Sequence, residues 1–269
     1  MKNSNVSAKS KGVVLFAFNT STVDYIKIAE QAARLIHHTL QLPVTLITDV
    51  KEPTAHFDQV ITVKHTLKNY KNTEQSEWRN ADRYNAYELS PYDETLLLDS
   101  DYLQLDTSLL KLFNVDFDYK LQHHNHLVDD NSTFIMGDTS LPYVWATVVA
   151  FRKTPKAKML FDLVGRIQRN YSYYRMLYNI SQRNFRNDYA FAIANSILNG
   201  YSLDIEQSIP WTMLSFYKPI SQIDVKGNKL IVRHEDQAHV IPQQNIHVMD
   251  KKYLLSDNFN LLVDTLCQN

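Results

Sequence analysis

Residues 96–103 read Leu-Leu-Leu-Asp-Ser-Asp-Tyr-Leu, an apolar run that ends in two carboxylates separated by one serine. The apolar part predicts a buried strand, and side chains two positions apart on an extended segment face the same side. Asp99 and Asp101 are therefore expected to point at one hard cation, which prefers oxygen ligands. The same three residues also occur as a solvated turn or a helix cap, so the stretch by itself leaves both interpretations open.

Composition limits the class of protein. The chain has 269 residues and 44% hydrophobic content, enough for one large α/β domain or two small ones around a buried core. Its 28 basic and 29 acidic residues produce no overall field that attracts nucleic acid, although local patches remain open. Cys267 is the single cysteine, which excludes an internal disulfide framework and a cysteine-rich metal site.

The apolar runs are far shorter than the roughly 20 residues that span a bilayer. The polar residues 1–11 lack the apolar core of a signal peptide and are expected to form a disordered tail. We therefore expect a cytoplasmic protein without a membrane-bound segment.

Strands and helices alternate through the first hundred residues. This alternation predicts an α/β fold with a mainly parallel sheet covered on both faces, and ligands bound beyond the carboxyl ends of the strands. Asp49 and Asp99 both fall at such ends. The expected strands are residues 12–18, 44–48, 59–63 and 95–98, and the expected helices are residues 78–89 and a helix to about Leu40 capped by Ser21 or Thr22.

The second half of the chain is expected to be more helical. His123, His124 and His126 have no acidic or cysteine partner at a recognisable ligand spacing, so we interpret residues 122–130 as a polar surface loop. The expected elements are a short helix to about Phe113, a strand at 143–151, helices at 156–178 and 188–198, and a hairpin of 220–225 with 229–232 around Gly227-Asn228.

Several motifs between residues 12 and 252 keep the order and spacing of a known family. They are Asn19 and Tyr25 beyond the first strand, Arg83 ahead of Asp99-Ser100-Asp101, Val-Val-Ala-Phe-Arg at 148–152 followed by Pro155, Asn-Asp-Tyr-Ala at 187–190, and His247. The chain thereby resembles the GT-A glycosyltransferases, particularly the glycogenin-like group.

The resemblance implies a GT-A type, Rossmann-like sheet flanked by helices, in a single domain over residues 12–269. Residues 12–115 would form a nucleotide-sugar half and residues 116–269 a more helical acceptor half. The implied metal is Mn²⁺ or Mg²⁺, with phosphate oxygens completing its shell. The implied site residues are Asp99, Asp101 and His247 on the metal, Asn19, Tyr25, Arg83, Ser100 and Lys251 on the donor, and Asp188 in catalysis.

The sequence departs from the family at two places. Trp145 stands where the family has a small or amide residue. Lys251 and Lys252 follow closely after His247 with no intervening glycine, whereas the family's lysine is usually further on. Asp188 is expected to bind the acceptor hydroxyl or the transferring sugar, or to act as general base in an inverting enzyme, and it also suits a helix cap.

The leading expectation is transfer of a sugar from a nucleoside diphosphate sugar, by resemblance a uridine diphosphate sugar, to an acceptor hydroxyl. Such transfer builds negative charge on the leaving diphosphate, which a metal stabilises. A sugar-phosphate nucleotidyltransferase is an alternative, but residues 18–21, Phe-Asn-Thr-Ser, lack the glycine-rich loop of that class. A non-catalytic nucleotide-sugar or nucleic-acid binding protein on the same scaffold is the third option.

One segment suggests an acceptor. Residues 163–187 contain five arginines and no acidic residue, with four tyrosines and Phe185 among them. Arginines contact phosphates and aromatic rings stack on bases, so a hydroxylated base in DNA is a candidate acceptor. The alternatives are an amphipathic helix with solvated arginines, or an oligosaccharide, protein or small-molecule acceptor stacked on the same tyrosines.

Overall fold

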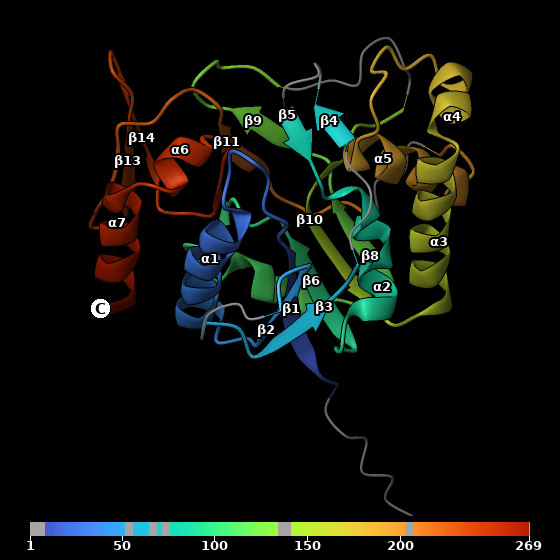
Figure 1. Cartoon of the computed structure of the whole chain (residues 1–269), viewed down its shortest axis with the longest axis horizontal. Helices are drawn as coiled ribbons and strands as arrows, with labels where there is room; N and C mark the ends of the chain where they lie inside the picture. Colours follow the sequence, from blue (N-terminus) through green and yellow to red (C-terminus); the bar gives the residue numbers. More distant parts are fainter. Residues whose placement is uncertain are drawn as a thin grey trace, which may run out of the picture.

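A computed structural model of the chain describes residues 9–51, 56–64, 69–71, 76–133, 141–202 and 207–268. Its centre is a six-stranded sheet in the order β3-β2-β1-β6-β10-β8 (Figure 1). β1, β2, β3 and β6 are parallel, whereas β10 runs antiparallel to both of its neighbours. The strands are β1 (Lys11–Phe16), β2 (Val44–Thr48), β3 (Gln59–Thr62), β6 (Glu94–Leu98), β8 (Tyr119–Gln122) and β10 (Trp145–Arg152). The expected α/β fold with a mainly parallel sheet is confirmed.

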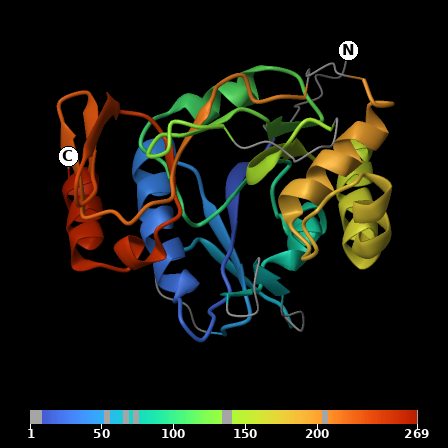
Figure 2. The same cartoon turned by 90° about the horizontal axis from the view of Figure 1, so that it is seen from above.

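Helices cover both faces of this sheet. α1 (Tyr25–Leu40) and α7 (Asp257–Gln268) lie on one side, and a second group of helices lies on the other (Figure 2). α7 packs on α1, where Arg34 and Asp264 form an ion pair of 2.5 Å. The helices of the second group are η1 (Ala81–Asn85), α2 (Ala86–Leu89), α3 (Pro155–Arg169), α4 (Tyr171–Leu177) and α5 (Asn187–Leu198).

A second, four-stranded sheet has the order β7-β15-β11-β9 and lies across the end of the molecule where β6 finishes. Its strands have only two to four residues, which is why no periodic pattern predicted them. They are β7 (Tyr102–Leu103), β9 (Asn125–Leu127), β11 (Met213–Phe216) and β15 (Ile246–Val248). The remaining elements are η2 (Ser108–Asn114), α6 (Lys251–Leu254), the pair β4 (Asn69–Lys71) and β5 (Ser76–Trp78), and the sheet β12 (Gln222–Lys226), β13 (Lys229–Arg233) and β14 (Ala238–Pro242).

The central strands are buried on both faces. The side chains of residues 96–98 and of β2 have almost no solvent contact, as expected for parallel strands covered by helices. Gly12 is required at the start of β1, because a Cβ there would lie 2.3 Å from the ring of Tyr92. On the other side of β6, where β10 pairs with it, Arg152 Nε donates to Glu94 Oε1 at a distance of 2.8 Å. The sheet is therefore a rigid base for the loops at its carboxyl end.

Two expected helices begin or end elsewhere. The cap of α1 is Asp24, whose Oδ1 accepts a hydrogen bond of 3.0 Å from Lys27 N, and not Ser21 or Thr22. The single helix expected at residues 156–178 is broken at Asn170. The Asn170 side chain donates to the Arg166 carbonyl at 2.9 Å, so an amide that competes with the backbone ends α3 and lets α4 start in a new direction.

Two further expectations are corrected. Residues 78–89 do not form one helix, because β5 ends at Trp78 and a 3₁₀ turn precedes α2. Residues 122–130 are not entirely a loop, since β9 pairs in parallel with β11. The hairpin around Gly227-Asn228 is confirmed, with Gly227 at a φ of +57°. Of the expected tail, residues 1–8 lie outside the described residues, and Ser10 bonds to Asp93 at 2.8 Å. No helix in the described ranges is long and apolar enough to cross a membrane.

Candidate active site

Asp99 and Asp101 lie on the turn that follows β6. The Tyr102 amide donates to the Asp99 carbonyl at 3.1 Å, so the chain reverses within these residues and does not continue as a strand. The carboxylates were expected to share a side through strand alternation, and this explanation is wrong. A β-turn brings them together, and it sends the chain directly into β7.

Each of these carboxylates has its own basic partner. Arg83, which is 1% exposed, forms an ion pair with Asp99 and also approaches the Leu97 carbonyl at 3.4 Å. Lys251 forms an ion pair with Asp101. Burial by itself would raise the pKa of Asp101, but Lys251 and His247 hold this pKa well below its usual range. Asp101 is therefore a carboxylate at neutral pH.

His247 reaches the turn through strand pairing. β15 pairs antiparallel with β7, and the register sets His247 opposite Tyr102, the residue after Asp101. Its Nε2 lies 3.5 Å from Asp101 Oδ2, and its Nδ1 lies 3.3 Å from the Ser215 hydroxyl. Ser215 in turn donates to Asn125 at 2.6 Å. This chain of contacts orients an imidazole that is 4% exposed.

The three side chains can hold a metal ion. One ligand atom from each of Asp99, Asp101 and His247 lies within 4.8 Å of the other two. Two ligands of one Mg²⁺ lie at most about 4.2 Å apart, twice the usual bond length, so only a small closure separates the present geometry from ligation. Two carboxylates with one imidazole suit Mn²⁺ or Mg²⁺. The donor set therefore fits a divalent cation.

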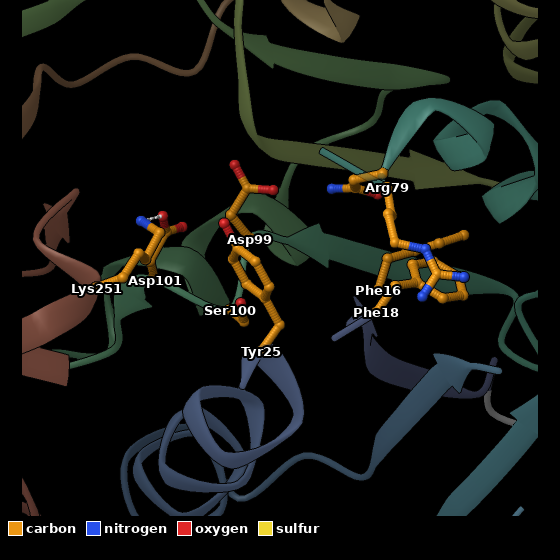
Figure 3. Close-up of a pocket in the computed structure, with 9 residues that line it drawn as sticks. Phe16, Phe18, Tyr25, Arg79, Asp99, Ser100, Asp101 and Lys251 are labelled. Atoms are coloured by element: carbon orange, nitrogen blue, oxygen red, sulfur yellow. Dashed lines mark hydrogen bonds and ion pairs between the residues drawn. The ribbon is translucent and has the colours of Figure 1, made fainter. Parts of the chain in front are cut away.

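A first hollow lies on the β1 side of the turn (Figure 3). Tyr25 extends from the start of α1 toward Asp99, and the Arg79 guanidinium lies 6.0 Å from the ring centroid of Phe18. Burial and the two aspartates raise the pKa of Tyr25, so its hydroxyl stays protonated and can donate a hydrogen bond. The lining residues are Phe16, Phe18, Tyr25, Arg79, Asn80, Asp99, Ser100, Asp101 and Lys251.

A second hollow lies on the β10 and α5 side of the same turn. Asp188 at the start of α5 accepts the Ala146 amide at 2.9 Å and pairs with Arg186 at 2.7 Å. In the part of the chain that the structure describes, the buried side-chain carbonyls of Asn80 and Asn187 have no hydrogen-bond partner. The lining residues are Asn80, Arg83, Asp99, Asp101, Trp145, Ala146, Thr147, Arg186, Asn187, Asp188, His247, Met249 and Lys251.

Most of the residues expected in a site come together around these two hollows. The exception is Asn19, whose Oδ1 accepts the Ile26 amide at 3.0 Å at the entry to α1 and which lines neither hollow. A single helix over residues 78–89 would set Arg79 and Arg83 on one face, but Arg79 precedes η1 and is not part of a helix. Both arginines nevertheless lie at the carboxyl end of the sheet. Arg79 forms an ion pair of 2.7 Å with Asp49, which follows β2, and Arg83 pairs with Asp99, which follows β6.

Several lining residues were not indicated as site residues by the sequence, among them Phe16, Phe18, Asn80 and Arg186. Phe16 and Phe18 belong to or follow a strand that reads as core, and Asn80 lies in a segment expected to be helical. Arg186 was considered only as part of the arginine-rich segment. Its position two residues before Asp188 was the signal that could have indicated a role in the site. Trp145, which departs from the resembling family, lies with its ring centroid 5.8 Å from that of His247.

Comparisons with known proteins bear on the fold. No protein-family model matches the sequence, and no curated protein matches it. An active-site variant of LgtC is 14% identical over 96% of this chain and 94% of its own, with a TM-score of 0.52. LgtC itself, a galactosyltransferase solved in complex with donor and acceptor sugar analogs, is 15% identical over 94% and 95% of the two chains, with a TM-score of 0.50.

The glycosyltransferase GlyE of Streptococcus pneumoniae TIGR4 matches 75% of this chain at 16% identity, with a TM-score of 0.41. The match spans 45% of the GlyE chain, and at that TM-score it adds nothing to the fold assignment. The likeness to LgtC extends over almost all of both chains, and it includes the central sheet and its covering helices. This chain therefore shares the overall fold of the glycosyltransferase LgtC.

Proposed function

We propose that this protein is a metal-dependent glycosyltransferase that moves a sugar from a nucleoside diphosphate sugar to an acceptor hydroxyl. The observation that carries the proposal is the meeting of Asp99, Asp101 and His247 at the carboxyl end of a parallel sheet, between two hollows of different chemistry. In open α/β sheets ligands bind at this end. The LgtC fold, represented by a galactosyltransferase bound to donor and acceptor sugar analogs, supports the same class of reaction.

The first hollow suits a nucleoside. Phe16 and Phe18 offer apolar rings, and Arg79 lies over the Phe18 ring, so a flat base has surfaces on which to stack. Tyr25 offers a protonated hydroxyl close to Asp99. We propose uridine as the base on the resemblance of the chain to the GT-A family, with Ser100 and Tyr25 at the donor.

The diphosphate would lie at the turn between the hollows. Arg83 and Lys251 are held there by Asp99 and Asp101. A divalent cation on Asp99, Asp101 and His247 would stabilise the negative charge that develops on the leaving diphosphate. Arg83 and Lys251 then remain as cations beside it, and their guanidinium and ammonium groups contribute further stabilisation.

The second hollow suits the transferring sugar and the acceptor. Asn80 and Asn187 present buried carbonyl oxygens without partners in the described structure, which can accept hydrogen bonds from sugar hydroxyls. Trp145 supplies an apolar ring for a sugar face. Asp188 would bind the acceptor hydroxyl or the sugar, and its ion pair with Arg186 holds the carboxylate in place for that role.

The test is a screen of nucleoside diphosphate sugars by thermal shift, with and without Mn²⁺, followed by a measurement of donor hydrolysis. We expect one uridine diphosphate sugar to raise Tm in the presence of Mn²⁺, because a ligand stabilises the fold in proportion to its affinity and concentration. Asp101→Asn should abolish this shift. Formation of a nucleoside diphosphate sugar from a nucleoside triphosphate and a sugar phosphate, with release of pyrophosphate, would instead establish a nucleotidyltransferase.

A further inference from the structure

The surface formed by the last turn of α3, by α4 and by residues 178–186 is called here the α4 surface. Residues 163–187 carry five arginines and no acidic residue, so this short segment has a formal charge of +5 in a chain of net charge −1. The remainder of the protein therefore has a formal charge of −6. Arg186 pairs with Asp188, so the other four arginines account for the excess positive charge of this segment in an otherwise acidic molecule.

The α4 surface is joined firmly to the second hollow. The Tyr171 hydroxyl donates to the Gln182 carbonyl at 3.1 Å, and the Tyr171 ring packs edge-on against Phe185 at 5.5 Å. Arg175 donates to the Ile180 carbonyl at 3.1 Å. Residues 180–186 lead directly into α5, whose first residues line the second hollow. The chain segment that supports α4 therefore continues into the helix that carries Asp188.

The outward side of α4 is apolar. Met176 is 68% exposed, Tyr173 61% and Leu177 57%. Tyr201 is also 57% exposed, and its hydroxyl lies 2.6 Å from that of Tyr178, the residue after α4. Figure 1 shows α4 at the end of the molecule where β9 and β11 lie. Several large apolar side chains exposed on one helix face indicate a binding surface.

Helix electrostatics explain only part of this arrangement. Arg166 and Arg169 lie in the last turn of α3, and Arg175 lies in the last turn of α4, where cations complement the helix dipole. That role does not explain Arg183, which is exposed and lies in no helix. It also does not explain why α4 presents methionine and leucine to solvent between the arginines.

We propose that the α4 surface binds DNA, and that the acceptor hydroxyl of this enzyme is carried by a DNA base. Arginines contact backbone phosphates, and Met176, Leu177 and Tyr173 pack against a base step, as apolar wedges do in proteins that kink DNA. The acceptor base is turned out of the stack toward Asp188 in the second hollow. The assignment of the acceptor rests on the proposed glycosyltransferase function, but the binding surface does not.

The experiment titrates the full chain against a fluorescent DNA duplex with one 5-hydroxymethylcytosine opposite a mismatched base, and follows anisotropy over a salt series. Log affinity should fall linearly with log salt concentration, by about 0.9 for each phosphate contact. Arg166→Ala combined with Arg183→Ala should reduce the slope by about 2, because two contacts are lost. Lys226→Ala combined with Lys229→Ala is the matched control, since it removes the same charge from the exposed β12–β13 turn.

A second pair of substitutions tests whether Met176 and Leu177 contact a base step. Leu177→Ala combined with Met176→Ala should weaken binding to the mismatched duplex more than binding to a fully paired one, while the slope against salt stays unchanged. Equal losses on both duplexes would contradict base-step contact. Stronger binding of an RNA duplex of the same sequence would overturn the choice of DNA.

The two proposals fail separately. Absence of DNA binding at low ionic strength, or equal weakening by the lysine pair, overturns the α4 surface even if the protein hydrolyses a uridine diphosphate sugar. Salt-dependent binding that only the arginine pair weakens supports the surface even if no donor binds, and in that case the glycosyltransferase assignment falls. Donor hydrolysis should be the same in the Arg166→Ala, Arg183→Ala double variant as in the unaltered protein.

Discussion

The two hollows on either side of the Asp99–Asp101 turn are built in different ways. The first takes eight of its nine lining residues from the first 101 positions, and only Lys251 comes from a distant segment. The second takes its residues from β10, the start of α5 and the region of β15, as well as from the turn itself. The first hollow follows from strand order in a parallel sheet, whereas the second needs the whole chain to be folded.

The ion pairs of the two hollows differ in the same way. In the first hollow the Arg79–Asp49 pair is at a strand end and both side chains are partly exposed. In the second hollow the Arg186–Asp188 pair anchors α5 to β10 through the Ala146 amide. Apart from the three metal ligands, changes in the first hollow should therefore alter donor affinity, and changes in the second should alter turnover.

The largest effect is expected at the turn that both hollows share. Asp99→Asn and Asp101→Asn should each lower Mn²⁺-dependent affinity for uridine diphosphate by more than about 100-fold, because each removes an oxygen ligand of the cation. Isothermal titration with and without Mn²⁺ measures this. Asp162→Asn, on the exposed face of α3, is the control. Unchanged affinity and unchanged Mn²⁺ dependence in both variants would end the metal assignment.

These two variants should differ in stability. Arg83 is buried and loses its counter-charge in Asp99→Asn, whereas Lys251, 15% exposed at its side chain, can turn toward solvent in Asp101→Asn. We expect Asp99→Asn to cost about 1–3 kcal/mol, less than the about 3–5 kcal/mol of a fully buried pair because Asp99 is partly exposed. Denaturant unfolding should rank Asp99→Asn as the less stable variant, and the opposite rank would contradict the role given to Arg83.

The next effect separates the second hollow from the first. Asp188→Asn should lower kcat by about 10²–10⁴-fold if the carboxylate acts as general base. Donor Kd should change by less than about threefold, which is under about 0.7 kcal/mol. Steady-state kinetics with titration of the donor measures both. An equal loss of donor affinity would move Asp188 to the donor site, and unchanged kinetics would leave it as the acceptor of the Ala146 amide alone.

A smaller effect is expected at His247. His247→Ala should weaken binding of Mn²⁺ and of the donor by about 10- to 100-fold, since two carboxylates remain on the cation. His126→Ala, on β9 of the same sheet, serves as the matched control. Titration of Mn²⁺ at fixed donor concentration gives the comparison. Binding equal to that of the unaltered protein would make His247 a structural residue held by Ser215.

The smallest effect should be confined to the first hollow. Arg79→Ala removes a guanidinium on which the donor base would stack, and a cation–π contact with that base of about 0.5–2 kcal/mol corresponds to a rise in donor Kd of about 2- to 30-fold. kcat should not change. Arg233→Ala, which removes a comparable ion pair on β13, is the control. A loss of kcat without a change in Kd would show that the two hollows do not divide binding and turnover as proposed.

The sequence by itself determined five of the six strands of the central sheet, all but β8, and the position of the paired aspartates. Apolar runs such as 96–98 are local patterns, and a buried parallel strand followed by polar residues is recognisable without its neighbours. Val44–Thr48 was predicted to the residue. His247 and Asp188 were located through the order of motifs in a resembling family, and composition and periodicity did not identify them.

Tertiary structure decided what surrounds those residues. β7 and β15 have two and three residues, too few for a periodic pattern, and their pairing joins positions about 145 apart in the chain to set His247 beside Asp101. The burial of Arg83 likewise depends on contacts with distant segments such as β10. The β-turn at residues 99–102 and the break at Asn170 rest on local hydrogen bonds, which the apolar pattern did not reveal. The polar side chains that follow a strand can be recognised in a short stretch of sequence. The second hollow, in contrast, exists only where separate segments of the folded chain meet.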